Sequence, residues 1–149
     1  FKLLVPYPSA AEEAAIVARF GEQGGPRRPE DFGIAPVTGP DQLAAASAAL
    51  KSVTIAPDVI DYIVRLVRAT RESADLSNGA SPRAAVLMAN AARARAALQG
   101  RDYVLPDDVK ALATAVLRHR LLLSPAAEIE GREVETLAGA LVEQIEAPR

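Results

Sequence analysis

The chain has 149 residues, a formal net charge of -2 and no cysteine. This length suits one domain, or one domain with an appendage, and is enough to bury a hydrophobic core. The nearly balanced charge disfavours a dedicated nucleic-acid binder, and the lack of cysteine excludes disulfides and thiolate metal sites. No apolar run reaches the ~18 residues that cross a bilayer and no signal peptide pattern occurs, so we expect a cytoplasmic protein. The alanine-rich, aromatic-poor composition favours an all-α fold.

A short apolar run opens the chain. Phe1–Val5 is followed directly by Pro6, which predicts a buried strand or the end of one, with a disordered terminus as the alternative. Because a lone strand leaves its backbone groups unpaired, we expect it to pair with a sheet outside this sequence. The first residue is also not methionine, so we interpret the chain as a segment of a longer protein.

A helix is predicted next. Ser9 and Glu12 have the spacing of a capping box, and Ile16, Val17 and Phe20 form one apolar stripe. A stripe of this kind ordinarily faces a hydrophobic core.

Residues 22–40 are rich in glycine and proline, which predicts a loop with one helical turn near Phe32. A connection of this length is usually functional or mobile. Arg27 and Arg28 within it suit an acidic partner, although two solvated arginines are the simpler interpretation.

Two further helices are predicted in the middle of the chain, one from Pro40 to Leu50 and one starting at Pro57. In the second helix, apolar residues recur at helical spacing at Val59, Ile60, Ile63, Leu66 and Val67. Its other side carries Arg65, Arg68 and Arg71. This arginine face is either solvated or lines a pore. Between the helices, Val53–Ile55 is expected to be extended, and Leu121–Leu123 is a second short strand that can pair with it.

The sequence Ser81-Pro82-Arg83 marks the start of another helix. Ser81 is a good N-cap, because its hydroxyl can accept a hydrogen bond from a first-turn N–H, and Pro82 suits the first helical position. Arg83 is unfavourable there, since a cation at the positive end of the helix dipole costs roughly 0.3–1 kcal/mol. A bound phosphate would satisfy both the guanidinium and the helix terminus. On local chemistry alone, a solvated arginine or one paired with Glu72 or Asp75 is favoured.

This helix is unusually rich in alanine, and small side chains let neighbouring helices approach closely. We expect Val86, Leu87 and Leu98 to supply the bulk of its packing. Arg93 and Arg95 are expected to face water.

The next helix is predicted to begin at Pro106, although Leu105 before it cannot act as a cap. Asp107 and Asp108 are expected to compensate through the helix dipole. His119 is the single histidine and has no metal-ligand pattern around it, so we interpret it as structural. A last amphipathic helix is marked by Val134, Leu137, Leu141 and Ile145.

Short motifs are distributed through nearly the whole chain: Tyr7–Ser9, Gly79–Ala84, Gly100–Val104, Pro106–Val109, Val116–Leu121 and Ala126–Gly131. Each motif is weak alone, but their order and spacing together resemble the C-terminal part of the MoxR family of AAA+ ATPases. The resemblance implies an AAA+ lid-type helical bundle with short strands, preceded by the last strand and the linking helix of an α/β nucleotide-binding core. Residues 1–21 would end that core, residues 22–40 would be a loop, and residues 41–149 would form the lid.

The resemblance also assigns site residues. In the family, the arginine that follows Ser-Pro is the sensor-2 residue, which reaches from the lid to the nucleotide phosphates. This role falls on Arg83, with Ser81 and Pro82 beside it in the ATP site. Tyr7 and Ile16 are then expected to contact the adenine base.

For the complete protein the resemblance implies ATP and Mg2+ as cofactors, and a homo-oligomeric ring, expected to be a hexamer. It also implies chaperone-like action on protein clients, often with a von Willebrand factor A domain partner. The sequence itself contains no phosphate-binding Gly-x-x-x-x-Gly-Lys-Ser/Thr loop and no strand that ends in magnesium-binding acids. We therefore expect no catalysis by this segment alone, and the missing core to lie N-terminal to Phe1. The alternative is a stand-alone helical interaction module without ATPase activity.

Overall fold

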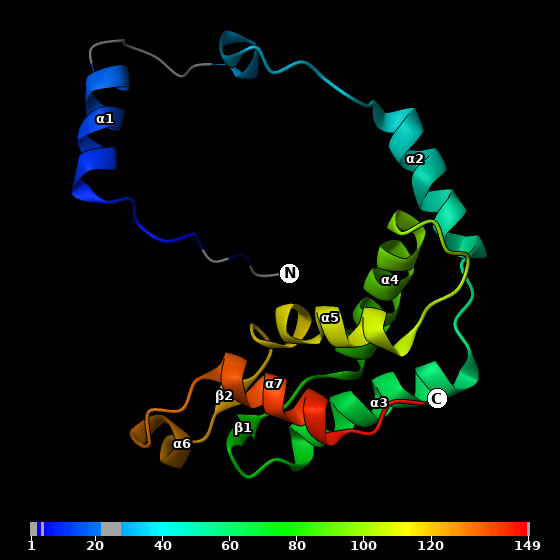
Figure 1. The fold of residues 1–149 in the computed structure, drawn as a ribbon. Coiled ribbons are helices and arrows are strands. Elements are labelled where there is room, and N and C mark those ends of the chain that lie inside the picture. The colour runs from blue at the N-terminus through cyan, green and yellow to red at the C-terminus, as the bar shows by residue number, and fades with distance from the viewer. Residues whose placement is uncertain (1–2, 4, 22–27, 149) are drawn as a thin grey trace. The chain divides into compact units, whose positions relative to one another are not determined.

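The computed structural model describes residues 3, 5–21 and 28–148. The chain divides into two compact units, and the boundary between them falls after Ala44 (Figure 1). Within the described residues, none of the helices is both long and apolar enough to cross a membrane.

The first unit, residues 3–44, contains α1 (Ala10–Phe20), a short 3-10 helix (Pro29–Phe32) and the beginning of α2 (Pro40–Ala49). The predicted capping box at the start of α1 is confirmed: the Ser9 N–H donates to the Glu12 carboxylate at 2.7 Å, and the Glu12 N–H donates to the Ser9 hydroxyl at 3.4 Å. Hydrogen bonding by Ser9 lowers the pKa of the Glu12 carboxyl.

The apolar stripe of α1 contributes no buried residue. The rings of Phe20 and Phe32 lie 6.2 Å apart, with the Arg19 guanidinium 5.4 Å and 5.9 Å from their centres. Ile16 and Val17 are 48% and 67% exposed, so the expectation that this stripe is ordinary core is wrong for the described chain. An isolated helix of 11 residues has too few neighbours here to bury one face.

The strand predicted for Phe1–Val5 is absent where the structure describes it. Leu3 and Val5 have no regular secondary structure and are 82% and 88% exposed, while residues 1, 2 and 4 lie outside the described residues. A strand needs a partner for its backbone groups, and neither Leu3 nor Val5 has a backbone hydrogen-bond partner among the described residues. Arg27 likewise lies outside the described residues.

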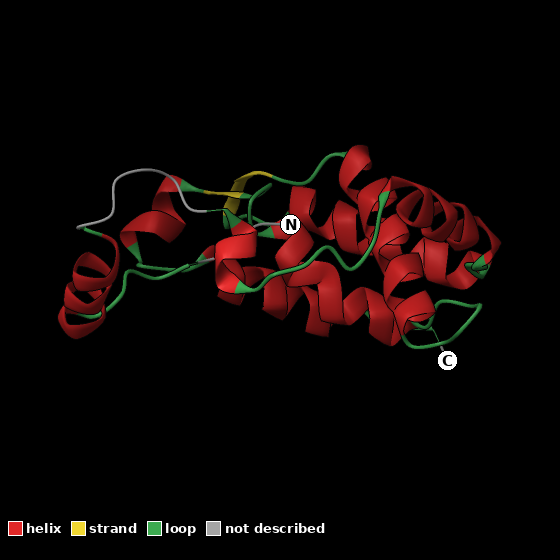
Figure 2. Ribbon diagram, turned by 90° about the horizontal axis from the view of Figure 1, so that it is seen from above, coloured by secondary structure: helices red, strands yellow, loops and turns green. Residues whose placement is uncertain are grey.

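The second unit is a helical bundle with a small two-stranded sheet, and the all-α, lid-type prediction is confirmed (Figure 2). After α2, a 3-10 helix (Leu50–Ser52) leads into α3 (Pro57–Glu72). The remaining elements are β1 (Leu76–Asn78), α4 (Pro82–Leu98), α5 (Pro106–Leu117), β2 (Leu122–Leu123), α6 (Pro125–Ile129) and α7 (Val134–Gln144). Helices α3, α4, α5 and α7 pack on one another and enclose the core.

Helix α3 buries the face that its sequence period predicts. Val59, Ile63, Leu66 and Val67 are at most 5% exposed, together with Tyr62 and Thr70. Ile60 differs from the prediction, because it lies at the edge of this face and is 49% exposed.

Helix α4 packs in a different way from the prediction. Its buried residues are Ala84, Met88, Ala92 and Ala96, one every four positions. Val86 and Leu98, which were expected to supply the bulk, are 61% and 88% exposed, and Leu87 is 37% exposed. The reason is geometric: α4 contacts α3 on one side and α5 on the other, and a row of small side chains allows this close approach.

The strand pairing also differs from the prediction. Leu121–Leu123 was expected to pair with Val53–Ile55, but β2 pairs antiparallel with β1, so that Leu123 lies opposite Leu76. Thr54 instead forms an isolated parallel bridge with Tyr103. The polar side chain of Ser77 reinforces the β1–β2 pair by donating to the Leu123 carbonyl at 2.8 Å.

Candidate functional site

The start of α4 has the backbone that the sequence predicts. Ser81 occupies the N-cap position with φ -79° and ψ 164°, and Pro82 is the first helical residue. The predicted hydrogen bond from a first-turn N–H to the Ser81 hydroxyl is absent. The Ala84 N–H donates instead to the Ser81 carbonyl at 2.9 Å, so the N–H that the hydroxyl would have taken already has an acceptor.

Arg83 lies exposed in the first turn of α4 and forms no hydrogen bond or ion pair with any residue that the structure describes. Its two predicted local partners are engaged elsewhere. Glu72 lies 3.7 Å from Arg68, and Asp75 accepts from Arg132 at 2.8 Å. The paired alternative for Arg83 is therefore wrong, which leaves a solvated guanidinium or one that receives an anion from outside the described chain.

The segment that leads into α4 is fixed to the end of α3. The Ala80 N–H donates to the hydroxyl of Thr70 at 2.9 Å, and the Ala80 carbonyl accepts from Arg71 Nε at 2.7 Å. Thr70 is fully buried, and its own hydroxyl proton is donated to the Val67 carbonyl at 2.7 Å. Arg71 therefore does not belong to a purely solvated or pore-lining face.

Gly79 permits this close approach. A Cβ atom placed on Gly79 would lie 2.6 Å from the Thr70 carbonyl oxygen and 2.8 Å from the Arg71 Cα. Both distances are to backbone atoms, so any larger residue would displace the segment from α3. The sequence marks Gly79 as a chain breaker but does not reveal that its role is contact with α3.

The other two arginines of the predicted row form pairs on the surface of α3. Arg65 donates to Asp61 at 2.8 Å, as the spacing of one turn predicts, and Arg68 lies 3.7 Å from Glu72. Each pair is exposed, so it contributes only a few tenths of a kcal/mol.

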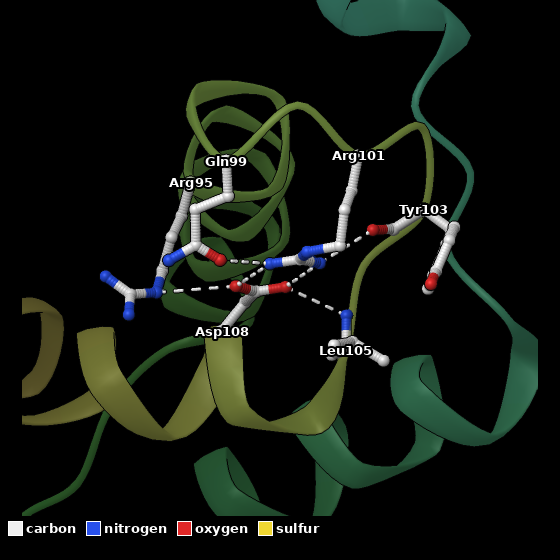
Figure 3. Close-up of polar contacts among 6 residues, drawn as sticks. All are labelled: Arg95, Gln99, Arg101, Tyr103, Leu105 and Asp108. Carbon is white, nitrogen blue, oxygen red and sulfur yellow. Dashed lines mark hydrogen bonds and ion pairs between the residues drawn. The ribbon is translucent and has the colours of Figure 1, made fainter.

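At its C-terminal end, α4 is tied to α5 by a polar cluster around Asp108 (Figure 3). Arg101 donates to both carboxylate oxygens of Asp108, at 2.8 Å and 2.7 Å, and Arg95 Nε lies 3.3 Å away. Gln99 accepts from Arg101 as well. Arg95 is therefore half-buried and paired rather than turned to water, and Arg93, also expected to face water, donates to the Val53 carbonyl at 3.1 Å.

Asp108 also supplies the cap that Leu105 cannot provide. The Leu105 N–H donates to the Asp108 carboxylate at 2.9 Å, so Asp108 acts through a direct hydrogen bond and not only through the helix dipole. Burial alone would raise the pKa of this carboxyl, but the hydrogen bonds from Arg101 and Leu105 outweigh it and hold the pKa below its usual value. A capping acid three residues after Leu105 was visible in the sequence, whereas its two arginine partners were not.

The two residues predicted to contact a base, Tyr7 and Ile16, belong to the first unit. Tyr7 is 96% exposed, and Ile16 is 48% exposed. Because Arg83 belongs to the second unit, a site that joins all three residues stays a prediction.

The chemistry of the Arg83 side chain suits a phosphate ligand. Arg83 offers a permanent positive charge and a planar set of N–H donors, which match phosphate oxygens. Among the described residues there is no group of three or more histidine, aspartate or glutamate side chains that could hold a metal ion. His119 lies beside Arg120, and their side chains are in contact.

In a comparison with protein families, residues 68–143 match the family described as the AAA lid domain. Among curated proteins, the chain is 32% identical to the uncharacterized protein YeaC of Bacillus subtilis, over 99% of this chain and 45% of that protein. It is 33% identical to chaperone MoxR1 of Mycobacterium tuberculosis, over 100% of this chain and 40% of that protein. The chain thus spans less than half the length of these two relatives.

Two further similarities are found. The chain is 38% identical to the magnesium-chelatase subunit ChlI of Nicotiana tabacum, over 60% of this chain and 20% of that protein. A crystal structure from Cytophaga hutchinsonii, of a protein provisionally described as an ATPase, matches with a TM-score of 0.76 and 25% identity, over 97% of this chain and 45% of that one. The resemblance to MoxR proteins that the sequence predicts is confirmed.

Proposed function

Since the chain belongs to the AAA lid domain family, we propose that it forms the lid of a MoxR-type ATPase, in which Arg83 faces the phosphates of a bound nucleotide. One observation carries this proposal. Arg83 lies exposed at a helix N-terminus without a partner among the described residues, although the carboxylates nearest in sequence are both paired with other arginines.

The chemistry of Arg83 suits phosphoryl transfer. ATP would supply the transferable phosphoryl group, whose oxygens carry negative charge throughout the reaction. A guanidinium aimed at those oxygens stabilises charge without having to reorganise at the moment of reaction. Ser81 and Pro82 fix where the first turn of α4 starts, and therefore where Arg83 can reach. Tyr7 and Ile16 are proposed to contact the base when the first unit lies beside the nucleotide.

The remaining machinery has to come from a nucleotide-binding core. The sequence has no phosphate-binding loop, and the described residues offer no carboxylate cluster for Mg2+. In this proposal, the core binds Mg2+ and ATP, and closure of the lid brings Arg83 to the phosphates. Lid position would then report nucleotide state to the next subunit of a ring, proposed to be a hexamer.

The partners are proposed from the relatives. One relative is described as a chaperone, and the resemblance to the MoxR family implies protein clients and a partner with a von Willebrand factor A domain. We propose the same class of client for this protein, with the cytoplasm as its location.

The test is the steady-state ATPase activity of the complete protein with Arg83→Ala. We expect kcat to fall by about 10²-fold or more, because one preorganised donor to the developing charge is lost. Arg68→Ala is the matched control, since Arg68 is an exposed arginine of the same unit whose partner, Glu72, is also exposed. Equal turnover in wild type and Arg83→Ala would overturn the proposal.

The second candidate is a helical interaction module without ATPase activity. It is favoured by the exposed apolar side chains of α4, of which Val86 is 61% exposed and Leu98 is 88% exposed. This candidate predicts that Leu98→Glu weakens partner binding while Arg83→Ala leaves it unchanged, which a pull-down with the complete protein's client would distinguish.

A further inference from the structure

We propose that Thr70 and Arg71 are positioning residues for Arg83, so that the last turn of α3 determines where the Arg83 guanidinium lies. This inference rests on the proposed function of Arg83. Neither residue touches the nucleotide in this proposal; both act through the backbone of Ala80, three residues before Arg83.

Two consecutive residues of α3 bind both polar backbone groups of Ala80. The hydroxyl of Thr70 accepts from the Ala80 N–H at 2.9 Å, and Arg71 Nε donates to the Ala80 carbonyl at 2.7 Å. Ala80 is 1% exposed and Thr70 is fully buried, so water does not compete effectively for the Ala80 N–H. These two groups belong to the two peptide planes that flank the Ala80 Cα, so neither plane can rotate without breaking its hydrogen bond to α3.

Thr70 is itself held in place. Its hydroxyl donates to the Val67 carbonyl at 2.7 Å, which leaves the oxygen lone pairs for Ala80. The contact is also close: a Cβ on Gly79 would lie 2.6 Å from the Thr70 carbonyl oxygen. The segment Gly79–Ala80 therefore lies directly against the backbone of α3, with no room for a side chain between them.

Only Ser81 separates the fixed residue from the helix that carries Arg83. Pro82 has a φ angle fixed by its ring, and a residue before proline is restricted to extended conformations. Ser81 has such a conformation, with φ -79° and ψ 164°. Little conformational freedom remains between Ala80 and the first turn of α4, so a displacement of the α3 end is transmitted to Arg83.

The use of Arg71 supports a positioning role. Arg65 and Arg68, on the same helix, pair with carboxylates one turn away, whereas Arg71 donates to a neutral carbonyl in the segment before Arg83. The pair Arg71 and Arg68 therefore offers a matched comparison: both are arginines in the second half of α3, and one of them contacts Ala80.

The first experiment tests the geometry in the chain itself. Amide hydrogen exchange at Ala80 is compared with exchange at Ala113, which is fully buried in α5. We expect Thr70→Val to accelerate Ala80 exchange at least tenfold relative to Ala113, and Thr70→Ser to restore it, because serine keeps the acceptor. If Thr70→Val does not fold, the Arg71→Met variant, compared with Arg68→Met, takes its place. If the ratio of the Ala80 exchange rate to the Ala113 exchange rate is unchanged in Arg71→Met, the inference is overturned.

The second experiment is a double-mutant cycle on ATPase turnover of the complete protein. We expect Arg71→Met to lower kcat about tenfold in the wild-type background, since a misplacement of about 1 Å can cost up to 10²-fold, and Arg71→Lys to recover part of the loss. In the Arg83→Ala background, Arg71→Met should have no further effect. Arg68→Met should leave kcat unchanged in both backgrounds.

The outcomes separate this inference from the proposed function. If Arg83→Ala alone leaves kcat unchanged, the proposed function fails. If Arg83→Ala lowers kcat but Arg71→Met lowers it by the same factor with and without Arg83, the role of Arg71 is merely structural and the inference fails while the proposed function stands. Loss of the Arg71 effect in the Arg83→Ala background supports both.

Discussion

Asp108 shows how one buried carboxylate can join three segments of a chain. It accepts from Arg101 in the loop before α5, from the Leu105 N–H at the start of α5, and lies 3.3 Å from Arg95 on α4. Its side chain is 3% exposed, so these partners take the place of water around the charge. Removal of the charge leaves Arg101 without its bidentate acceptor.

Asp108→Asn should therefore lower the free energy of unfolding by about 2–3 kcal/mol at neutral pH, measured by urea denaturation. Asp107→Asn is the matched control. Asp107 is exposed in the same turn, so this substitution should lower the free energy of unfolding by less than about 1 kcal/mol.

The sign of the pH dependence of this stabilisation follows from the lowered pKa of Asp108. The stabilisation is fully present above the unfolded pKa, near 3.9, and is lost as the pH falls toward the lower folded pKa. The difference between wild type and Asp108→Asn should hold steady above about pH 5 and shrink as the pH falls below about 4, and a difference that stays constant would contradict this account.

At the scale of elements, α3 and α4 differ in how much of their packing can be predicted from sequence. The sequence of α3 predicts its buried face, because large apolar residues recur every three or four positions and charged residues lie on the other side of the helix. Helix α4 has alanine on several sides, so its sequence does not distinguish a buried face from an exposed one. Its few large apolar residues led to a wrong prediction of the buried face. The hydrogen bond between Thr70 and Ala80 and the ion pair between Arg95 and Asp108 were also missed, since the first two residues lie 10 positions apart and the other two lie in different helices. What could be predicted was local: the capping box of α1, the helix starts at Pro57, Pro82 and Pro106, and the place of Arg83 in the first turn of α4.

A pair of substitutions in α4 tests this packing. Met88→Ala should lower the free energy of unfolding by about 2–5 kcal/mol, because Met88 is fully buried and alanine would leave a cavity. Leu98→Ala removes a side chain of similar size that is 88% exposed, and should change stability by less than about 0.5 kcal/mol. Thermal and urea unfolding of the two variants measure the contrast, and similar losses in both would refute the assignment of the buried face.

At the scale of the whole molecule, the core belongs to one unit. All residues of the buried cluster lie between Val53 and Val142, and none of the described residues from 3 to 44 is buried. The second unit therefore has the features of a domain that folds by itself, with its own hydrophobic core. The first unit has helices but no buried face.

Deletion of residues 1–39 should consequently preserve folding of the remainder. We expect the fragment that begins at Pro40 to unfold in one cooperative transition, with a free energy within about 1 kcal/mol of the full chain, because no buried contact of the core is removed. The converse fragment, residues 1–39, should show little helix by circular dichroism, since an isolated 11-residue helix such as α1 is marginal in water. A truncated fragment that loses cooperativity would show that the first unit contributes to the core.

The attachment of Ala80 to the end of α3 also bears on protein engineering. The hydrogen bonds that hold Ala80, just before α4, come from Thr70 and Arg71, which are encoded upstream of that helix. A chimera that exchanges α4 alone would combine the arginine of one protein with the residues that another protein has at positions 70 and 71. A donor segment that starts before Thr70 would transfer Thr70 and Arg71 together with Arg83.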